Sequence, residues 1–253
     1  MPEEEAEEAR AALAALFAAG WEERQQGAEV ELAVYGGSQD EERLRQALGP
    51  VEASPVAADW GERWRSFHHG VRVGPLWIGP PWEPVPADAI AVVVDPGQAF
   101  GTGAHPTTRL CLELLLEQRA SSVADLGCGS GVLAIAAAKL GFDPVVAVDH
   151  DPAAVEAALV NARRNGVEVD AYLLDVGSDA LPRAELGLAN LELASIASVA
   201  DRFGGSRLIA SGYLAGEQAR PEGWTRVVGR EREHWTAELF ERRTEARSGE
   251  ETR

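Results

Sequence analysis

Residues 123–141 read VADLGCGSGVLAIAAAKLG, and this stretch decides the fold. An apolar run carrying one acid comes first, glycines follow at alternate positions, and an Ala-rich segment ends the stretch. Glycine lets the backbone turn sharply and approach a ligand without Cβ atoms in the way. The start of the following helix adds backbone N–H donors. The stretch therefore predicts a strand, a ligand-binding loop and a helix.

Strand and helix patterns alternate on both sides of this stretch. Helices of this length between strands imply right-handed crossovers and a mostly parallel sheet. The last two strand-like runs have no helix between them, which predicts an antiparallel hairpin at the end of that sheet. Helices are expected at 106–119, 131–141, 152–166 and, as a short helix, between 190 and 207; strands are expected at 89–97, 122–126, 145–149, 169–175, 186–190, 207–212, 224–232 and 234–243.

The N-terminal residues predict a small α+β domain over 1–57. Its expected elements are a helix at 3–19, a strand at 27–37, a helix at 38–49 and one more strand at 50–56. Trp60, Trp64 and Phe67 then form one apolar stripe of a linker helix, 58–70, which we interpret as packing between domains. The main domain is expected to cover 71–245, with a disordered tail at 246–253.

The net charge of −18 over 253 residues argues against a function driven by attraction to nucleic acid phosphates. A basic protein partner fits this charge better, although solubility alone also explains it. Lys139 is the only lysine, so a P-loop nucleotidase, which needs a lysine in its glycine loop, is excluded.

Targeting and metal signals are weak. The N-terminus MPEEEAEEAR is acidic where a signal peptide is basic, and no apolar run has the length of a membrane span, so a cytoplasmic protein without membrane contact is expected. Cys111 and Cys128 form no CxxC pair, which argues against disulfide scaffolds and zinc ribbons. The adjacent His68 and His69 make a poor metal site, and no metal is expected.

The glycine spacing is G-x-G-x-G and not the G-x-G-x-x-G of dinucleotide folds. Together with Asp125 at the end of the preceding strand, Gly127 and Gly129 suit a ligand with a cationic amino-acid end, such as S-adenosylmethionine, better than a pyrophosphate.

Three further polar residues follow predicted strands. Asp149 is placed to accept the two hydroxyls of a ribose, a feature that NAD and S-adenosylmethionine proteins share. Asp151 precedes Pro152 and is interpreted as a helix cap. Asp175 is a candidate adenine contact or simply ends its strand, and Asn190 is a candidate for the reacting end or a turn residue.

Six motifs occur in a fixed order along the chain: AFGTGAHPTTRL (99–110), DLGCGSGVLAIAAAKLG (125–141), VDHDP (148–152), NARRNGV (161–167), ANL (189–191) and SGYL (211–214). In this order they resemble the PrmA-type methyltransferases, which modify lysines of the eleventh protein of the large ribosomal subunit. The resemblance covers residues 58–242, and the G-T-G-x-H-x-T-T loop is its most specific part.

The resemblance implies a class I Rossmann-like α/β fold with a mostly parallel seven-stranded sheet, S-adenosylmethionine as the cofactor, and a ribosomal protein as substrate. A monomer is expected. It implies that residues 99–110 fold over the cofactor, and that Asn190 is the catalytic residue. His105 is expected to have a structural or positioning role. The expected cofactor-binding residues are Phe100, Gly101, Thr102, Gly103, Thr108, Asp125, Gly127, Gly129, Asp149, Asp175 and Asn190.

The chain departs from the family pattern in two places. It begins directly with an acidic helix, and the helix after Asn190 is short. Both departures affect the recognition of the substrate that accepts the methyl group more than the binding of the cofactor. The alternatives are therefore a methyltransferase that acts on another protein or a small molecule, and a non-catalytic S-adenosylmethionine-binding module. A nicotinamide dehydrogenase is disfavoured by the glycine spacing and the terminal hairpin.

Overall fold

The computed structural model describes residues 69–95 and 103–243, and in the N-terminal part residues 6, 9, 12, 13, 22–26, 29–34 and 38–53. The chain divides into two compact units, Met1–Trp64 and Arg65–Arg253. Most of the predicted linker helix, residues 58–68, lies outside the described residues, and residues 69 and 70 are not helical.

The smaller unit contains an antiparallel pair of strands, β1 (Glu22–Gln26) and β2 (Glu29–Ala33), and the helix α2 (Ser38–Leu48). The described positions at 6, 9, 12 and 13 are helical. The strand β1 was not predicted, because its sequence EERQQ has no apolar alternation. The strand predicted at 50–56 is wrong for its described part, since residues 50–53 belong to no strand, while 54–56 lie outside the described residues.

A seven-stranded sheet in the order β11-β12-β10-β9-β6-β7-β8 is the centre of the larger unit. The strands from β10 to β8 in this order are parallel, whereas β12 runs antiparallel to β10, and β11 to β12. The predicted parallel sheet with a terminal hairpin is confirmed. The strands are β6 (Val123–Leu126), β7 (Val145–Asp149), β8 (Asp170–Leu173), β9 (Leu186–Asn190), β10 (Arg207–Leu214), β11 (Trp224–Arg232) and β12 (Trp235–Arg242).

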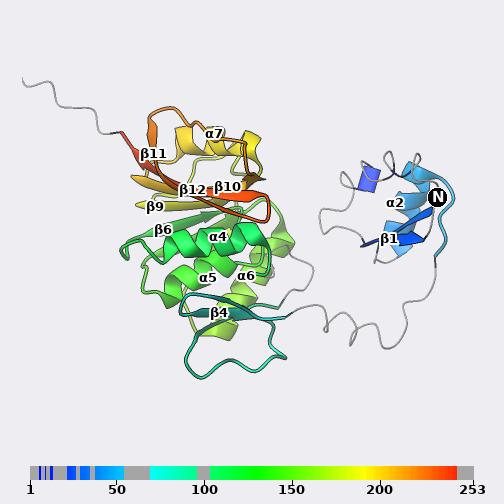
Figure 1. Cartoon of the computed structure of the whole chain (residues 1–253), viewed down its shortest axis with the longest axis horizontal. Coiled ribbons are helices and arrows are strands. Elements are labelled where there is room, and N and C mark those ends of the chain that lie inside the picture. Colours follow the sequence, from blue (N-terminus) through cyan, green and yellow to red (C-terminus); the bar gives the residue numbers. More distant parts are fainter. Residues whose placement is uncertain are drawn as a thin grey trace, which may run out of the picture. The chain divides into compact units, whose positions relative to one another are not determined.

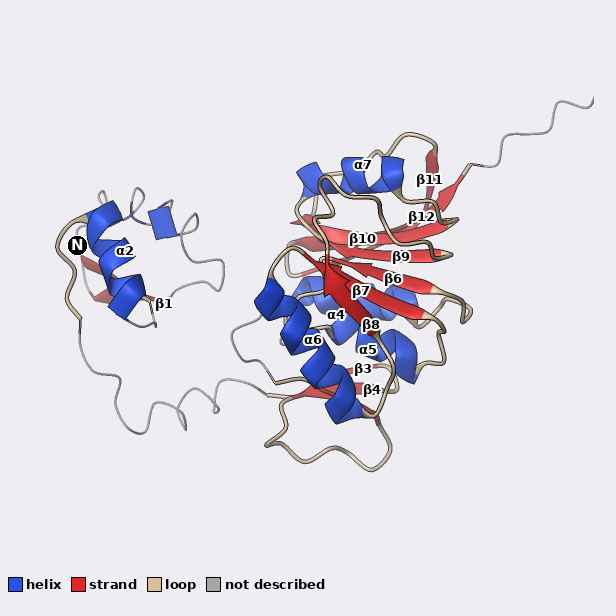
Figure 2. Cartoon of the chain, turned by 180° about the vertical axis from the view of Figure 1, so that it is seen from behind, coloured by secondary structure: helices blue, strands red, loops and turns tan. Residues whose placement is uncertain are grey.

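Helices cover both faces of this sheet (Figures 1 and 2). The helices α4 (Pro106–Leu115), α5 (Val132–Lys139) and α6 (Pro152–Asn165) lie on one face, and α7 (Leu193–Arg202) lies on the other. A second, three-stranded sheet packs against α5 and α6. It consists of β3 (Val71–Val73), β4 (Leu76–Gly79) and β5 (Ile90–Val93). Because α5 lies between two sheets, its apolar residues all round the helix are buried.

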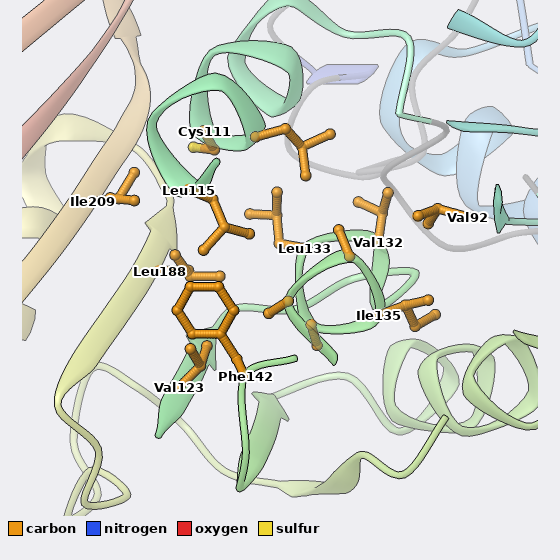
Figure 3. Close-up of a cluster of buried hydrophobic side chains, with 14 of the residues drawn as sticks. Val92, Cys111, Leu115, Val123, Val132, Leu133, Ile135, Phe142, Leu188 and Ile209 are labelled. Carbon is orange, nitrogen blue, oxygen red and sulfur yellow. The ribbon is translucent and has the colours of Figure 1, made fainter. Parts of the chain in front are cut away.

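The two faces of the large sheet have separate cores. On the face of α4 and α5, side chains such as Leu115, Leu133, Phe142 and Leu188 pack together (Figure 3). The core beneath α7 includes Phe203 and contains no side chain of α4, α5 or α6. Cores on both faces are typical of parallel strands, and because these strands run in one direction their carboxyl ends lie at one edge.

Two details of this unit differ from the prediction. The helix predicted at 106–119 ends at Leu115. The N–H groups of Glu117 and Gln118 donate to the carbonyls of Leu114 and Leu115, three residues back, which is the tighter 3₁₀ pattern common at the end of an α-helix. The strands β3 and β4 were not predicted, since proline, glycine and tryptophan dominate their surroundings. In the described part of the chain, no helix is both long and apolar enough to cross a membrane.

Candidate cofactor and methyl-transfer site

The strands β9, β6 and β7 are neighbours in the sheet and run parallel. Their carboxyl ends therefore meet at one edge, the usual place of a ligand site in such sheets. Asn190 ends β9, the glycine loop follows β6, and Asp149 ends β7. The structure thus brings together side chains that the sequence placed at the ends of separate strands.

The glycine loop makes its turn with left-handed backbone angles. The φ angles of Gly127, Gly129 and Gly131 are +80°, +51° and +80°, which residues with a Cβ rarely adopt. The N–H of Gly127 donates to the carbonyl of Val148 at 2.8 Å, which holds the loop against β7. A Cβ at Gly127 would lie 2.6 Å from Cδ2 of Leu191, so a side chain there would force Leu191 to shift.

Asp149 holds this loop from β7. Its Oδ2 accepts the N–H of Gly129 at 2.9 Å, and its Oδ1 accepts the N–H of Asp151 at 3.0 Å. The side chain is nearly buried, and its Oδ1 lies 3.4 Å from Nδ1 of the exposed His150. Each carboxylate oxygen has a further lone pair. Asp149 can therefore accept ribose hydroxyls while it keeps the loop in place.

Asp125 lies fully buried in β6, behind the glycine loop. Its Oδ2 accepts the N–H of Ala134 at 3.0 Å, but its Oδ1 has no hydrogen-bond partner among the described residues. Burial, and to a smaller extent the charge of Asp149, raise the pKa of Asp125 to about 7. A buried carboxylate oxygen without a partner is costly, so this position suits a cationic ligand group. The ammonium group of S-adenosylmethionine fits this requirement.

Thr108 and Asn190 meet across the edge of the sheet. The Nδ2 of Asn190 donates to Oγ1 of Thr108 at 3.5 Å, although the two residues are 82 apart in the sequence. Thr108 is buried in the first turns of α4, whereas Asn190 keeps part of its surface exposed. The contact leaves the Oδ1 acceptor of Asn190 for a reacting group.

His105 begins α4 as its N-cap. Its Nδ1 accepts the N–H of Thr107 at 3.4 Å and lies 2.8 Å from Oγ1 of the same residue. Its ring meets Trp235 edge to face, with 5.0 Å between the centroids. Burial lowers the pKa of His105, against a weaker opposing effect of Glu233, and so favours the neutral ring that a cap needs. These contacts support the structural role expected from the sequence.

The other predicted site residues are placed less directly. Phe100, Gly101 and Thr102 lie outside the described residues. Gly103, with a φ of +80°, is packed so closely on β4 that a Cβ would come within 2.2 Å of Cγ2 of Ile78. Asp175 is exposed and accepts hydrogen bonds in its own turn, from the N–H of Gly177 at 2.7 Å among others, which favours the structural alternative named above.

Sequence reasoning missed two residues that shape the site. The N–H of Leu191 donates to the carbonyl of Ser211 at 2.8 Å, and its side chain covers Gly127. Gly212, with a φ of +104°, lies at a bulge of β10 where a Cβ would come within 2.2 Å of the Leu191 carbonyl. The motifs ANL and SGYL contain these residues, but only the pairing of β9 with β10 shows that they meet.

The comparison with known families shows to which family the chain belongs. The family described as ribosomal protein L11 methyltransferase (PrmA) matches residues 2–237. The chain belongs to this family. It is an S-adenosylmethionine-dependent methyltransferase, as the resemblance implied, and the orphaned oxygen of Asp125 and the glycine loop fit that cofactor.

Individual relatives agree with this assignment. A ribosomal protein L11 methyltransferase of Marinobacter nauticus is 39% identical over 221 residues, which cover 76% of this chain and 74% of that protein. One of Alteromonas mediterranea is 42% identical over 190 residues, which cover 71% of this chain but only 63% of the relative, so the family members are longer than the matched part. The crystal structure of a ribosomal protein L11 methylase from Lactobacillus delbrueckii subsp. bulgaricus matches with a TM-score of 0.62 and 28% identity, covering 70% of this chain and 100% of that one.

Proposed function

We propose that the protein transfers methyl groups to lysine or N-terminal amino groups of a large-subunit ribosomal protein, L11. Membership of the family supports this acceptor, and the names of the relatives state it for those proteins. A net charge of −18 suits a basic protein partner. A ribosomal substrate also favours the cytoplasm as the place of action.

The observation that carries the proposal is the contact between Asn190 and Thr108 at the edge that also holds Asp125 and Asp149. A module that only bound the cofactor would need the two aspartates and the glycine loop. It would have no use for an amide that ends the neighbouring strand and lies 3.5 Å from the buried hydroxyl of Thr108.

When bound, S-adenosylmethionine supplies an electrophilic methyl group on a sulfonium. The residues of the chain would hold it as follows: Asp149 accepts hydroxyls of the ribose, Asp125 faces the ammonium group, and the glycine loop offers close backbone approach. We propose that Phe100, Gly101, Thr102 and Gly103 add contacts from the loop before α4. Asp175 remains a candidate for an adenine contact only through lone pairs that its own turn does not use.

The acceptor amine must lose its proton before it attacks. A free lysine has a pKa of about 10.4, and partly apolar surroundings lower this pKa because they disfavour the cation. The Oδ1 of Asn190 can accept a hydrogen bond from the neutral amine and aim its lone pair. Holding both reactants in the right geometry contributes up to about 7–11 kcal/mol in well-positioned reactions, and Asn190 would supply part of this orientation.

The test is methyl transfer to purified L11 with labelled S-adenosylmethionine, followed by mass spectrometry of the modified residues. Label on lysine or on the N-terminus in the wild type, and its loss in Asn190→Ala, is the expected result. Cofactor binding without label in L11, but with label in another protein or a small molecule, would exclude the ribosomal acceptor while keeping the reaction.

A further inference from the structure

Two asparagines of α6 are buried on the same side of the helix. Asn161 and Asn165 are 1% and 8% exposed and lie one turn apart. A buried amide is costly unless both its oxygen and its nitrogen find partners. In both residues they do, but the partners differ in kind.

Asn165 completes the edge of the small sheet. The strand β5 pairs with β4 on one side only. On its other side, Oδ1 of Asn165 accepts the N–H of Val93 at 2.8 Å, and its Nδ2 donates to the carbonyl of Val93 at 2.7 Å. The amide thus acts as a neighbouring strand would, which is a role in the fold.

Asn161 connects two segments instead of one. Its Oδ1 accepts the N–H of Asp95 at 3.1 Å, just after β5. Its Nδ2 donates to the carbonyl of Ser130 at 3.0 Å, inside the glycine loop. One side chain therefore joins the glycine loop to the segment that leads toward residues 99–110.

The glycine loop is consequently held at two consecutive residues. Asp149 accepts the N–H of Gly129, and Asn161 donates to the carbonyl of Ser130. The helix α6 also touches the next residue, since a Cβ at Gly131 would lie 2.9 Å from Cβ of Ala158. Because a peptide unit is planar, fixing the Ser130 carbonyl also fixes the direction of the next N–H.

We propose that Asn161 is a positioning residue for cofactor binding, which acts by fixing the Ser130 carbonyl and with it the backbone of the glycine loop. It touches the loop and not the cofactor. The proposal rests on the assignment of this loop to S-adenosylmethionine. Preorganised backbone of this kind contributes affinity because the ligand does not have to order it.

Aspartate in place of asparagine gives a matched pair of variants. Asn161→Asp keeps the acceptor for the Asp95 N–H and for Arg164, whose Nη1 lies 3.3 Å from Oδ1 of Asn161, and replaces the donor to Ser130 with an oxygen that the Ser130 carbonyl repels. Asn165→Asp is the matched change one turn along α6. It keeps the acceptor for the Val93 N–H and loses the donor, which bonds the carbonyls of Val93 and Asn161 and does not reach the glycine loop. S-adenosylhomocysteine carries no net charge, and both variants add one negative charge to α6, so a difference in affinity between them would not arise from that charge alone.

The experiment measures the Kd of S-adenosylhomocysteine by calorimetry and the Tm of the full chain. We expect Asn161→Asp to raise the Kd about tenfold and Asn165→Asp to raise it less than about twofold. This difference should hold even if the two variants lower the Tm equally. Steady-state kinetics should show a higher KM for the methyl donor in Asn161→Asp with kcat little changed. Amide exchange at Gly129 should be faster in Asn161→Asp than in Asn165→Asp.

Equal Kd values for the two variants, or a Kd change that only follows Tm, would overturn the proposal. If Asn161→Asp does not fold, Asn161→Ala is judged against Asn165→Ala by the same criterion. A wild-type chain that does not bind S-adenosylhomocysteine would instead refute the cofactor assignment, so the two failures are distinguishable.

Discussion

The side-chain amide of Asn190 donates to the buried hydroxyl of Thr108 at 3.5 Å and so joins the end of β9 to the first turns of α4. The donor of this pair is the amide nitrogen, which leaves the amide oxygen for the acceptor amine. The orientation of a reacting amine is thus linked to the helix that follows the loop 99–110.

Asn190→Ala should lower kcat for methyl transfer by about 10²–10³-fold, because it removes the group that orients the amine. The Kd of S-adenosylhomocysteine should change only a few-fold. Thr108→Ser, which keeps the hydroxyl, is the matched control and should retain most activity, whereas Thr108→Val should not. A large rise in Kd with unchanged kcat in Asn190→Ala would assign the residue to cofactor binding instead.

Asp149→Ala should abolish measurable cofactor binding, since it removes the expected ribose acceptor and the partner of the Gly129 N–H together. Calorimetry with S-adenosylhomocysteine checks this. Asp151→Ala is the control. The Oδ1 of Asp151 caps α6 by accepting the N–H of Ala153 at 2.8 Å, so the substitution should lower the stability by about 1 kcal/mol without weakening cofactor binding. Unchanged affinity in Asp149→Ala would reject the site.

Asp125 should make both stability and binding depend on pH. Its pKa is raised from 3.8 to about 7, so between these values the folded state holds more protons than the unfolded state, and the free energy of unfolding falls as the pH rises. Above about pH 7, Asp125→Asn should stabilise the cofactor-free protein by on the order of 2 kcal/mol. Melting curves at low and high pH measure this difference.

The same carboxylate should strengthen cofactor binding as the pH rises through about 7, because the ammonium group of the ligand pairs with the ionised form of Asp125. Asp125→Asn should bind more weakly and lose this dependence. A pH-independent Kd in the wild type would show that the ammonium group does not face Asp125.

Gly127→Ala should lower the stability by about 1–2 kcal/mol because of its positive φ alone. The clash with Leu191 should lower the stability further and weaken the binding of the cofactor. Gly166→Ala is the control, since its φ is +64° but a Cβ there would meet nothing within 4 Å. The double change Gly127→Ala with Leu191→Ala should remove the clash but not the backbone strain at residue 127. Chemical denaturation and calorimetry separate the two contributions.

His105→Asn should keep activity within about threefold, because asparagine also caps helices and burial favours the neutral form of the His105 ring. Burial lowers the pKa of His105, so its contribution to stability is present above pH 6.5 and is lost as the pH falls through the lower folded value. A loss of more than about 100-fold in kcat for His105→Asn, at unchanged Tm, would show a catalytic role that the structure does not indicate.

Much of the larger unit was predictable because its signals are local. The run from Val123 to Gly141 contains its strand, turn and helix within one stretch, and apolar runs that end in Asp149 and Asn190 mark the edge of the sheet without knowledge of their neighbours. The strands β3 and β4 escaped prediction, because three or four residues among prolines, glycines and tryptophans show no periodicity.

The sequence by itself determined the order along the chain of the strands and helices of the seven-stranded sheet, the glycine loop and the acids that follow the strands, since each depends on residues a few positions apart. Only the tertiary structure decided that Asn190 meets Thr108, that Asn161 joins Ser130 to Asp95, and that one oxygen of Asp125 is buried without a partner. The two asparagine contacts join residues that are 31 to 82 positions apart and that only the packing of the sheets brings together. The state of Asp125 depends on the exclusion of water from its surroundings, which no local sequence pattern records.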